Sequence, residues 1–152
     1  MLEQFDTDKD GKISAEEASK VTQIGGARKG IADLKGIEIF TELQELYCLY
    51  NQLTELDVSK NTQLVHLDCS GNQLTVLDVS KNTQLKALRC ADNKLTALDA
   101  TAIEVNILDC GAQKDERKLQ LTLGNAHNRR IWNWTGKHKP NNRNVIAKDE
   151  DE

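Results

Sequence analysis

Hydrophobic and polar positions recur along most of this chain with a period of 21 residues. The period is clearest in three consecutive units, residues 43–63, 64–84 and 85–104, of which the last is one residue shorter. Each unit has the form LxxLxCxxNxLxxLD, and the stretch LDVSKNTQL occurs twice, letter for letter, at 56–64 and 77–85. A fixed period of roughly 20 to 50 residues is typical of solenoids, in which each unit packs only on its neighbours. The pattern therefore predicts a stack of repeated turns.

The segment around each cysteine alternates apolar and polar residues, as in Leu46-Tyr47-Cys48. This alternation indicates a strand with one buried face, and we expect the strands of successive units to stack in parallel. Only about ten residues remain in each unit after LxxLxCxxNxL, so the return half is expected to be extended or a short 3₁₀ turn. Within LDVSKNTQL, residues 59–62 and 80–83 are expected to form polar turns that face solvent.

An asparagine follows each of the three clearest strands, at Asn51, Asn72 and Asn93. We expect its amide to bond the buried backbone of its own turn and of the neighbouring turns, because a buried amide without partners costs about 1–3 kcal/mol. These features resemble the leucine-rich repeat, LxxLxLxxNxL, with cysteine in the third apolar place. The predicted fold class is α/β, a leucine-rich repeat solenoid of about five short turns with a parallel β-sheet on its concave face. A weaker unit at 21–42 and a partial one at 105–112 complete the five.

The two open ends of a solenoid expose apolar surface and need caps. The predicted organisation is an N-terminal cap with a helical, EF-hand-like calcium loop at 1–20, repeats at 21–112, a C-terminal strand and helix cap at 113–148, and an acidic tail at 149–152. In the C-terminal cap, KLQLTLG (118–124) alternates like a strand, and residues 125–136 are expected to form a short helix between Asn125 and Gly136. Trp132 and Trp134 are expected to cover the last repeat, in preference to stacking on a ligand.

The stretch DTDKDGKISAEE, residues 6–17, fills every position of the EF-hand calcium loop. Three carboxylates, a backbone carbonyl, a polar side chain and a bidentate glutamate at this spacing form a cage of hard oxygen ligands. The predicted Ca²⁺ ligands are Asp6, Asp8, Asp10, Lys12 through its carbonyl, Ser14 and Glu17. Because no second loop is present to pair with this one, we expect Ca²⁺ to be a structural cofactor that ties down a short helix at 15–20. The alternative is an acidic, solvated segment without metal.

Four cysteines recur at intervals of 21, 21 and 20 residues in the same inward place of successive strands: Cys48, Cys69, Cys90 and Cys110. Side chains stacked in parallel register rarely adopt the dihedral geometry of a disulfide, and a line of thiolates does not converge on a tetrahedral zinc ion. The spacing therefore favours buried free thiols that act as small hydrophobic side chains.

The outward strand positions form the usual interaction surface of a solenoid. Tyr47, Leu49 and Tyr50 place much of the scarce aromatic and apolar surface near one end of that face, as in a binding hot spot. The predicted partner-binding residues are Glu45, Tyr47, Leu49, Tyr50, His66, Asp68, Arg89 and Asp109. A histidine beside carboxylates can act as a general base, but no nucleophile motif or catalytic metal spacing accompanies it, so no enzyme is expected. A solvated face without a specific partner is the alternative.

The charge pattern limits the classes of partner. The net charge is −4, and no basic run is long enough to follow a phosphate backbone, so nucleic acid is not expected. The chain starts without the pattern of a secretory signal and contains no apolar run of about 18 residues, so no transmembrane segment is expected. We expect a monomer.

Three stretches, FDTDKDGKISAEEA, GIADLKGIEIF and LDVSKNTQLVHLDCSGNQLTVLDVSKNTQL, resemble a group of secreted leucine-rich repeat proteins of anaerobic gut-type bacteria. The ending from LTLGNAHNRRIWNW through NNRNVIA resembles their C-terminal cap. The resemblance implies a right-handed solenoid, a calcium-loop cap, a secreted or cell-surface location and protein binding somewhat like that of internalins. Gly26, Lys29 and Gln113 depart from the repeat pattern, so the ladder is expected to hold only in the middle three units.

Taken together, the sequence predicts a non-enzymatic protein-interaction or adhesion module that binds an unidentified protein or glycan on its sheet face, with a structural Ca²⁺ site in its N-terminal cap. The alternative is a calcium-stabilised structural spacer domain of a larger cell-surface protein.

Overall fold

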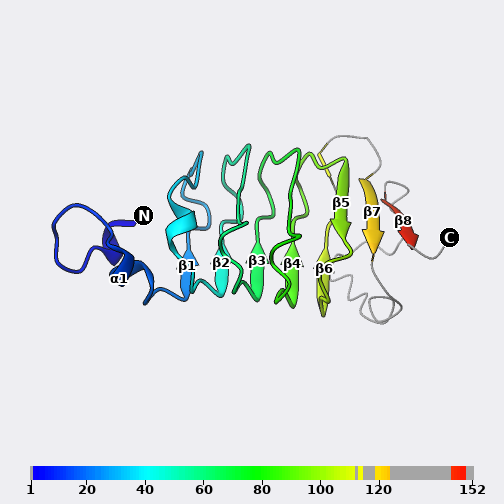
Figure 1. Ribbon diagram of the computed structural model, residues 1–152. Coiled ribbons are helices and arrows are strands. Elements are labelled where there is room, and N and C mark those ends of the chain that lie inside the picture. The colour runs from blue at the N-terminus through cyan, green and yellow to red at the C-terminus, as the bar shows by residue number, and fades with distance from the viewer. Residues whose placement is uncertain (1, 112, 115–118, 124–144, 150–152) are drawn as a thin grey trace.

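The computed structural model is an elongated solenoid, shown in Figure 1, and it describes residues 2–111, 113–114, 119–123 and 145–149. The helix expected at 125–136, with Trp132 and Trp134, lies outside the described residues. None of the described helices is long and apolar enough to cross a bilayer.

A five-stranded parallel sheet runs along one side of the solenoid, with one short strand from each turn (Figure 1). Its strands, in spatial order, are β1 (Gln23–Gly25), β2 (Glu45–Tyr47), β3 (His66–Asp68), β4 (Ala87–Arg89) and β6 (Ile107–Asp109). Every strand pairs with its neighbour in the register of the repeat, so that Leu46 lies beside Leu67 and Leu67 beside Leu88. The prediction of about five turns with a parallel sheet is therefore confirmed.

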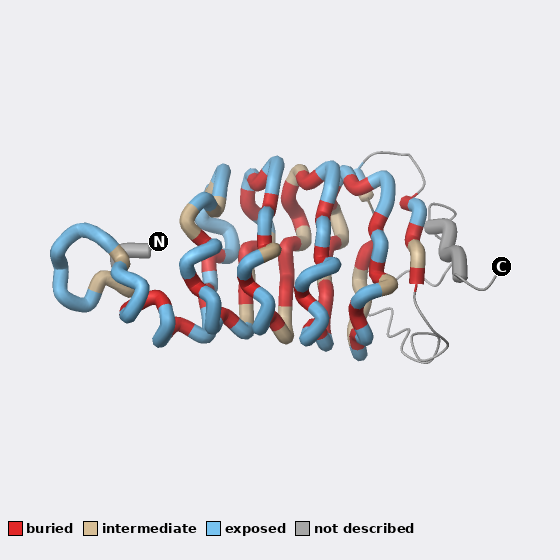
Figure 2. The backbone as a smooth tube through the Cα atoms, in the orientation of Figure 1, coloured by how far each residue is buried: buried red, intermediate tan, exposed pale blue. Residues whose placement is uncertain are grey.

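Leucines fill the interior between the strands and the return segments, by which we mean residues 52–63, 73–84 and 94–104. The middle residue of each strand from β1 to β4 points inward and is no more than 1% exposed. Figure 2 shows the same alternation of buried and exposed residues in every turn. Burying a leucine side chain stabilises a fold by about 1.5–3 kcal/mol, so this regular stripe accounts for the stacking of the units.

A second parallel sheet lies on the opposite side at the C-terminal end, in the order β5 (Ala97–Ala100), β7 (Leu119–Leu123) and β8 (Val145–Asp149). The strand expected at 118–124 is thus confirmed as β7, whose three leucines are buried. β5 was not predicted as a strand. It forms because its backbone pairs with β7, with Leu98 beside Leu121, a partner that is distant in sequence and invisible to local pattern.

The N-terminal end consists of a 3₁₀ helix, η1 (Leu2–Phe5), the acidic loop and a one-turn helix, α1 (Ala15–Ala18). A second 3₁₀ helix, η2 (Ile37–Ile39), lies in the return of the first turn. The rings of Phe5 and Phe40 meet edge to face with centroids 5.7 Å apart, and Ala18 is fully buried. These contacts attach the N-terminal segment to the first turn.

The side-chain amides that follow the strands form the predicted ladder. Asn72 Nδ2 donates to the carbonyl of Cys48 in the preceding turn (3.0 Å) and to that of Cys69 in its own turn (2.9 Å). Its Oδ1 accepts the N–H of Leu53 (3.0 Å). The asparagines one turn before and one turn after make equivalent bonds.

Gln113 extends this ladder, and the expectation that only the middle three units would take part is wrong at this end. Its Nε2 donates to the carbonyls of Cys90 (3.2 Å) and Cys110 (2.9 Å), and its Oε1 accepts the N–H of Leu95 (2.9 Å). The longer glutamine side chain therefore bonds the same groups as the asparagines do: a carbonyl of the preceding turn, a carbonyl of its own turn and a backbone N–H.

A second asparagine ladder lies in the return segments, where the sequence predicted solvent-facing polar turns. That prediction is wrong for Asn61 and Asn82, both of which are 0% exposed. Asn61 Nδ2 donates to the carbonyls of Ile37 and Phe40, and Asn82 Nδ2 donates to those of Val58 and Asn61, all at 2.9 Å. The Oδ1 atoms of both asparagines are buried without a hydrogen-bond partner in the described structure. In the return turn each of these carbonyls also accepts a backbone N–H group, so the asparagine amides act there as second donors that join successive turns.

The two ladders are expected to differ in energy. Asn72→Leu leaves the buried N–H of Leu53 without its acceptor and removes one of the two amide donors to the carbonyls of Cys48 and Cys69, so it should lower the free energy of unfolding by about 3 kcal/mol. Asn82→Leu removes an oxygen that has no partner, and the carbonyls of Val58 and Asn61 keep the backbone N–H groups of Asn61 and Leu64 as donors, so it should cost about 1 kcal/mol. Urea denaturation would measure both, with exposed Asn106→Leu as a control expected within about 0.5 kcal/mol of the parent. Equal losses for Asn72→Leu and Asn82→Leu would contradict the assignment.

Candidate interaction face and N-terminal acidic loop

The solvent side of the five-stranded sheet, here called the strand face, carries most of the predicted partner-binding residues in two aligned rows. Register places Glu45 beside His66 in one row and Tyr47, Asp68, Arg89 and Asp109 side by side in the other. These side chains are half-buried, except that Asp68 is only 9% exposed. Leu49, just beyond β2, is also half-buried. The placement of these residues agrees with the sequence, while their role in binding stays a prediction.

Glu45 holds two neighbouring side chains in place. The Tyr47 hydroxyl donates to its carboxylate at 3.1 Å, and His66 Nδ1 lies 3.4 Å from the other carboxylate oxygen. Partial burial, and then the hydrogen bond to Glu45, raises the pKa of Tyr47 above its ordinary value of 10.0. The phenol therefore stays a neutral hydrogen-bond donor at physiological pH.

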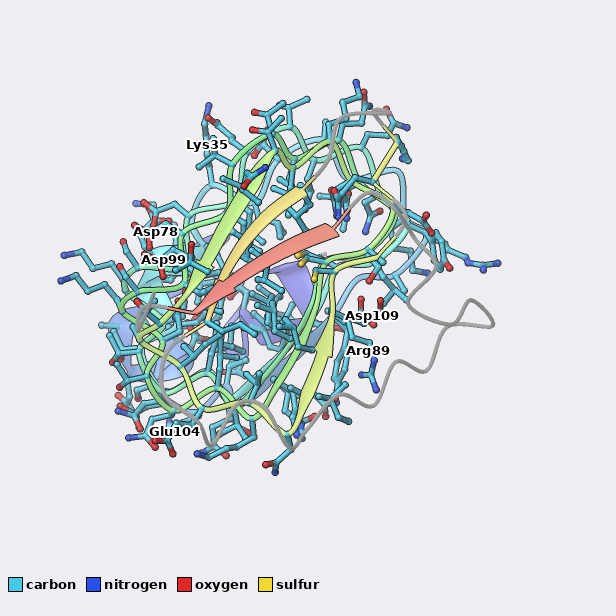
Figure 3. All side chains as sticks on the ribbon, turned by 90° about the vertical axis from the view of Figure 1, so that its right-hand side faces the viewer. Lys35, Asp78, Arg89, Asp99, Glu104 and Asp109 are labelled. Carbon is cyan, nitrogen blue, oxygen red and sulfur yellow. The ribbon has the colours of Figure 1, made fainter. Side chains whose placement is uncertain are left out.

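Arg89 lies between two aspartates whose orientation is set by the backbone. Asp68 Oδ1 accepts the N–H of Ser70 (3.1 Å), and Asp109 Oδ1 accepts that of Gly111 (3.4 Å). Among the described residues, Arg89 has no side-chain hydrogen bond or ion pair. Figure 3 shows Arg89 and Asp109 on one side of the molecule and Lys35, Asp78 and Asp99 on the other. The guanidinium is thus available to a partner, between two fixed negative charges.

Tyr50 does not belong to the rows. It adopts a left-handed backbone conformation (φ 54°) beyond β2, and its side chain is 46% exposed. The guanidinium carbon of Arg28 lies 4.7 Å from the ring centroid, a cation–π contact. The ring also lies against Gly71 (φ 70°), where a Cβ atom would overlap Cδ1 and Cε1 of the ring. The ring of Tyr50 therefore contacts both Arg28 and Gly71, an arrangement that sequence spacing did not indicate.

The four cysteines form a row of buried, free thiols behind the strand face. Burial raises the pKa of Cys48 and of Cys110 to about 12, and the pKa values of Cys69 and Cys90 are also raised well above 9.0 by burial. Because the thiolate is the reactive form, these residues act as packing groups at physiological pH.

The acidic loop brings together three of the predicted metal ligands. Carboxylate oxygens of Asp6, Asp8 and Asp10 lie within 4.8 Å of one another. Gly11 has the left-handed conformation (φ 86°) that the sharp turn requires, and its N–H donates to Asp6 Oδ2 at 2.9 Å. Asp6 Oδ1 is buried and has no hydrogen-bond partner in the described structure. These carboxylates form the one group suited to a metal ion among the residues that the structure describes.

Glu17 does not join this group. Its Oε1 accepts the N–H and the hydroxyl of Thr7 (2.6 and 2.7 Å), and its Oε2 accepts the N–H and hydroxyl of Ser14 (both 2.9 Å). Ser14 in turn accepts the N–H of Glu17, which completes a capping box at the start of α1. Hydrogen bonds from Ser14 and Thr7 lower the pKa of Glu17 to about 2. Ser14 and Glu17 thus cap a helix, and Glu17 is not one of the three clustered carboxylates, while the roles of the Lys12 carbonyl and of Ser14 as ligands stay predictions.

Comparison with known proteins agrees with the repeat architecture. The structure of the functional domain of InlJ from Listeria monocytogenes, which includes a cysteine ladder, matches 76% of this chain with a TM-score of 0.68 and 37% identity. The chain has the leucine-rich repeat fold. An internalin (inlF) from L. monocytogenes strain 4b F2365 matches 82% of the chain with a TM-score of 0.57 and 15% identity, a likeness of fold alone.

The similarity in sequence is local. Internalin J of L. monocytogenes serotype 4b (strain F2365) is 44% identical over 50 residues, which are 33% of this leucine-rich repeat chain and 6% of internalin J. The chain spans 25% of the InlJ structure and 49% of the internalin (inlF) structure. No protein-family model matches the sequence. The row of Cys48, Cys69, Cys90 and Cys110 is similar to the cysteine ladder of InlJ.

The contact between Tyr50 and Gly71 yields a prediction about stability. Gly71→Ala should lower the free energy of unfolding by about 2–3 kcal/mol, because it adds both left-handed strain and overlap with the ring. Asp92, at the equivalent position one turn later, adopts a similar conformation (φ 55°) although it has a side chain. The left-handed strain in Gly71→Ala should therefore account for only about 1 kcal/mol of the loss. A double-mutant cycle with Tyr50→Ala, measured by denaturation, separates the two terms. Additive losses would contradict the overlap.

Proposed function

We propose that this chain is a non-enzymatic interaction module that binds a protein partner through its strand face. The observation that carries the proposal is the arrangement around Arg89. Its half-buried guanidinium has no side-chain partner among the described residues and lies between Asp68 and Asp109, whose carboxylates are oriented by backbone N–H groups. Arginine and tyrosine are enriched among the residues that dominate binding energy at protein interfaces.

Preorganisation of the face supports this proposal. Glu45 restrains both Tyr47 and His66, so these side chains lose little further freedom when a partner docks. Tyr50 is held by its contacts with Arg28 and Gly71 and remains 46% exposed, so it is also available for contact with a partner. A planar bidentate donor such as Arg89 suits a carboxylate or a backbone carbonyl pair, which favours a protein partner over a glycan.

We further propose that the acidic loop holds a structural Ca²⁺ ion. Support comes from the clustered oxygens of Asp6, Asp8 and Asp10 and from the buried, unpartnered Asp6 Oδ1. Oxygen donors at this spacing suit Ca²⁺, and the Lys12 carbonyl and Ser14 are proposed to add ligands. For Glu17 to act as a ligand, it would exchange its hydrogen bonds with Thr7 for the metal. The ion would then fix the loop that precedes α1.

The proposed setting is a secreted or cell-surface bacterial protein, in line with the similarity to internalin J. A structural spacer within a larger surface protein is the second candidate function, favoured by the small share of internalin J that the chain spans. Neither role requires nucleic acid, and the chain is proposed to act as a monomer.

The strand-face proposal predicts a selective loss of binding. Immobilised parent chain should capture a partner from the proteins that surround its native organism, and the Tyr47→Ser, Arg89→Ser pair should reduce the affinity for that identified partner at least about tenfold. A control pair of exposed return-segment changes, Lys81→Ser and Gln84→Ser, should leave capture unaltered. If the Tyr47→Ser, Arg89→Ser variant has the same Tm as the parent and binds the partner with unchanged affinity, the proposal is wrong.

The calcium proposal predicts stabilisation by metal. With an affinity of about 10⁻⁴ to 10⁻³ M, 5 mM Ca²⁺ should add about 1–2 kcal/mol, or roughly 2–8 °C in Tm, relative to chelator. Asp6→Ala should abolish this increment, whereas Asp99→Ala, an exposed aspartate in β5, should preserve it. Differential scanning calorimetry checks the outcome, and a parent Tm that is indifferent to Ca²⁺ would refute a structural ion.

A further inference from the structure

The charges on the strand face alternate in sign along the solenoid. In one row, Tyr47 is followed by Asp68, Arg89 and Asp109, one residue from each successive strand. Figure 3, a view along the solenoid, shows Arg89 and Asp109 on the same side of the molecule. Neighbouring strands lie about 4.8 Å apart, so the three charges are spaced at about 4.8 and 9.6 Å. A partner therefore meets negative, positive and negative charge at regular steps.

The charges of this row are not paired with one another. Among the described residues, Arg89 forms no ion pair within 4.0 Å, and each aspartate accepts only a backbone N–H group of its own turn. Asp68 is only 9% exposed, but Glu45, on the strand before it, has a side chain that is 35% exposed. The negative charge on that side of Arg89 thus comes from Asp68 and Glu45 together.

Small side chains border the charged row. Ala87, two residues before Arg89 on β4, is 5% exposed. On the other side of the row, the next outward positions of four successive turns are Leu49, Ser70, Ala91 and Gly111. The turns stay in register there, because the N–H of Gly71 donates to the carbonyl of Ala91 at 2.9 Å. An element of a partner can therefore approach the sheet closely along the row, with Leu49 at one end.

The spacing of the row fits a helix better than an extended segment. On an α-helix, residues i+3 and i+7 lie on the same face as residue i, about 4.5 and 10.5 Å further along the axis. Side chains on one face of an extended chain recur about every 6.7 Å, so the third lies roughly 13 Å from the first. The charged row requires about 4.8 and 9.6 Å, which the helix matches to within about 1 Å.

A second copy of the chain is a poor occupant of this face. The face carries the carboxylates of Glu45, Asp68 and Asp109 against the guanidinium of Arg89. Two copies placed face to face would therefore repel each other. The same excess of negative charge favours a helix whose contacting face is basic overall.

We propose that the strand face binds an α-helix of the partner protein, which lies across the strands and carries basic, acidic and basic side chains about one turn apart. The acidic side chain pairs with Arg89. One basic side chain pairs with Asp109 and the other with Asp68 and Glu45, while an apolar side chain one turn beyond packs on Tyr47. This inference rests on the proposed function, because it specifies the partner of the same face.

The probe is a fluorescein-labelled peptide of about 18 residues, kept helical by lactam bridges on its far side, and the readout is anisotropy with the full chain at about 150 mM salt. The matched probe carries lysine, glutamate and lysine at positions i, i+3 and i+7. Leucines at i−4 and i+11 place an apolar side chain near Tyr47 in either direction of the helix. A permuted probe has glutamate at i and lysine at i+3 and i+7, so its net charge is the same. A proline probe keeps the matched residues but has no lactam bridges and carries prolines that break the helix.

Two variants of the chain test the central ion pair. Arg89→Glu reverses the charge in the middle of the row, and Lys81→Glu makes the same change at an exposed position of a return segment. Thermal melting verifies that both variants are folded. We expect the parent to bind the matched probe about tenfold more tightly than the permuted or the proline probe. Arg89→Glu should weaken binding of the matched probe about tenfold, Lys81→Glu less than about twofold, and a probe with lysine in place of the central glutamate should restore binding to the Arg89→Glu variant.

The helix proposal is overturned if the parent does not bind the matched probe, if the permuted or proline probe binds equally well, or if Arg89→Glu and Lys81→Glu weaken binding equally. It is also overturned if sedimentation shows a dimer that Arg89→Glu dissociates, since the occupant is then a second copy. Capture by the Tyr47→Ser, Arg89→Ser pair distinguishes this failure from failure of the proposed function. If that pair loses affinity for the captured partner while the helical probe does not bind, the strand face is a binding site and only the helix is wrong.

Discussion

The structure depends on the need to give buried backbone groups of each turn a hydrogen-bond partner. The chain bends twice in each unit of the solenoid. At both bends, carbonyl groups point into a leucine core, where water cannot serve as their hydrogen-bond donor. Asn72 and its equivalents meet this need after the strand, and Asn61 and Asn82 give the return-segment carbonyls a second donor beside a backbone N–H group. Because each amide bonds two successive turns, the same interaction that closes a turn also sets its register on the next.

This fixed register separates the two sides of the molecule. On the strand face each strand pairs in parallel with its neighbours through the backbone, so outward side chains differ between units without disturbing the stack. Tyr47, Asp68 and Arg89 occupy one aligned row for that reason. On the return side the side chains repeat, and hydrogen bonds from the N–H of Gln73 to the carbonyl of Leu53 and from Asn82 Nδ2 to that of Val58 hold successive segments together. One side thus offers side chains that vary from turn to turn, and the other offers side chains that repeat.

The ends and bends contain the features that break the repeat. Tyr50 occupies a left-handed position where Gly71 stands in the next turn, and the absence of a side chain at Gly71 makes room for the ring between it and Arg28. At the N-terminal end, Glu17 caps α1 and accepts a hydrogen bond from the N–H of Thr7. These bonds couple the acidic loop to the helix without a metal ion. Local packing, and not the period of 21, decides the conformation at these places.

The sequence by itself determined the period, the five parallel strands, the inward row of cysteines and the ladder at Asn51, Asn72 and Asn93, because each depends on a contact between equivalent positions of adjacent units. It also placed Glu45, Tyr47, His66, Asp68, Arg89 and Asp109 outward by alternation. Asn61 and Asn82 recur at the same place in the exact repetition of LDVSKNTQL, which is consistent with their burial. A polar residue at a turn does not by itself show whether its amide faces water or a carbonyl. Only the tertiary structure decided that β5 pairs with β7, that Gln113 continues the ladder and that Glu17 stands apart from the clustered aspartates. These features arise between segments with no common sequence pattern, where side-chain reach and backbone spacing set the outcome.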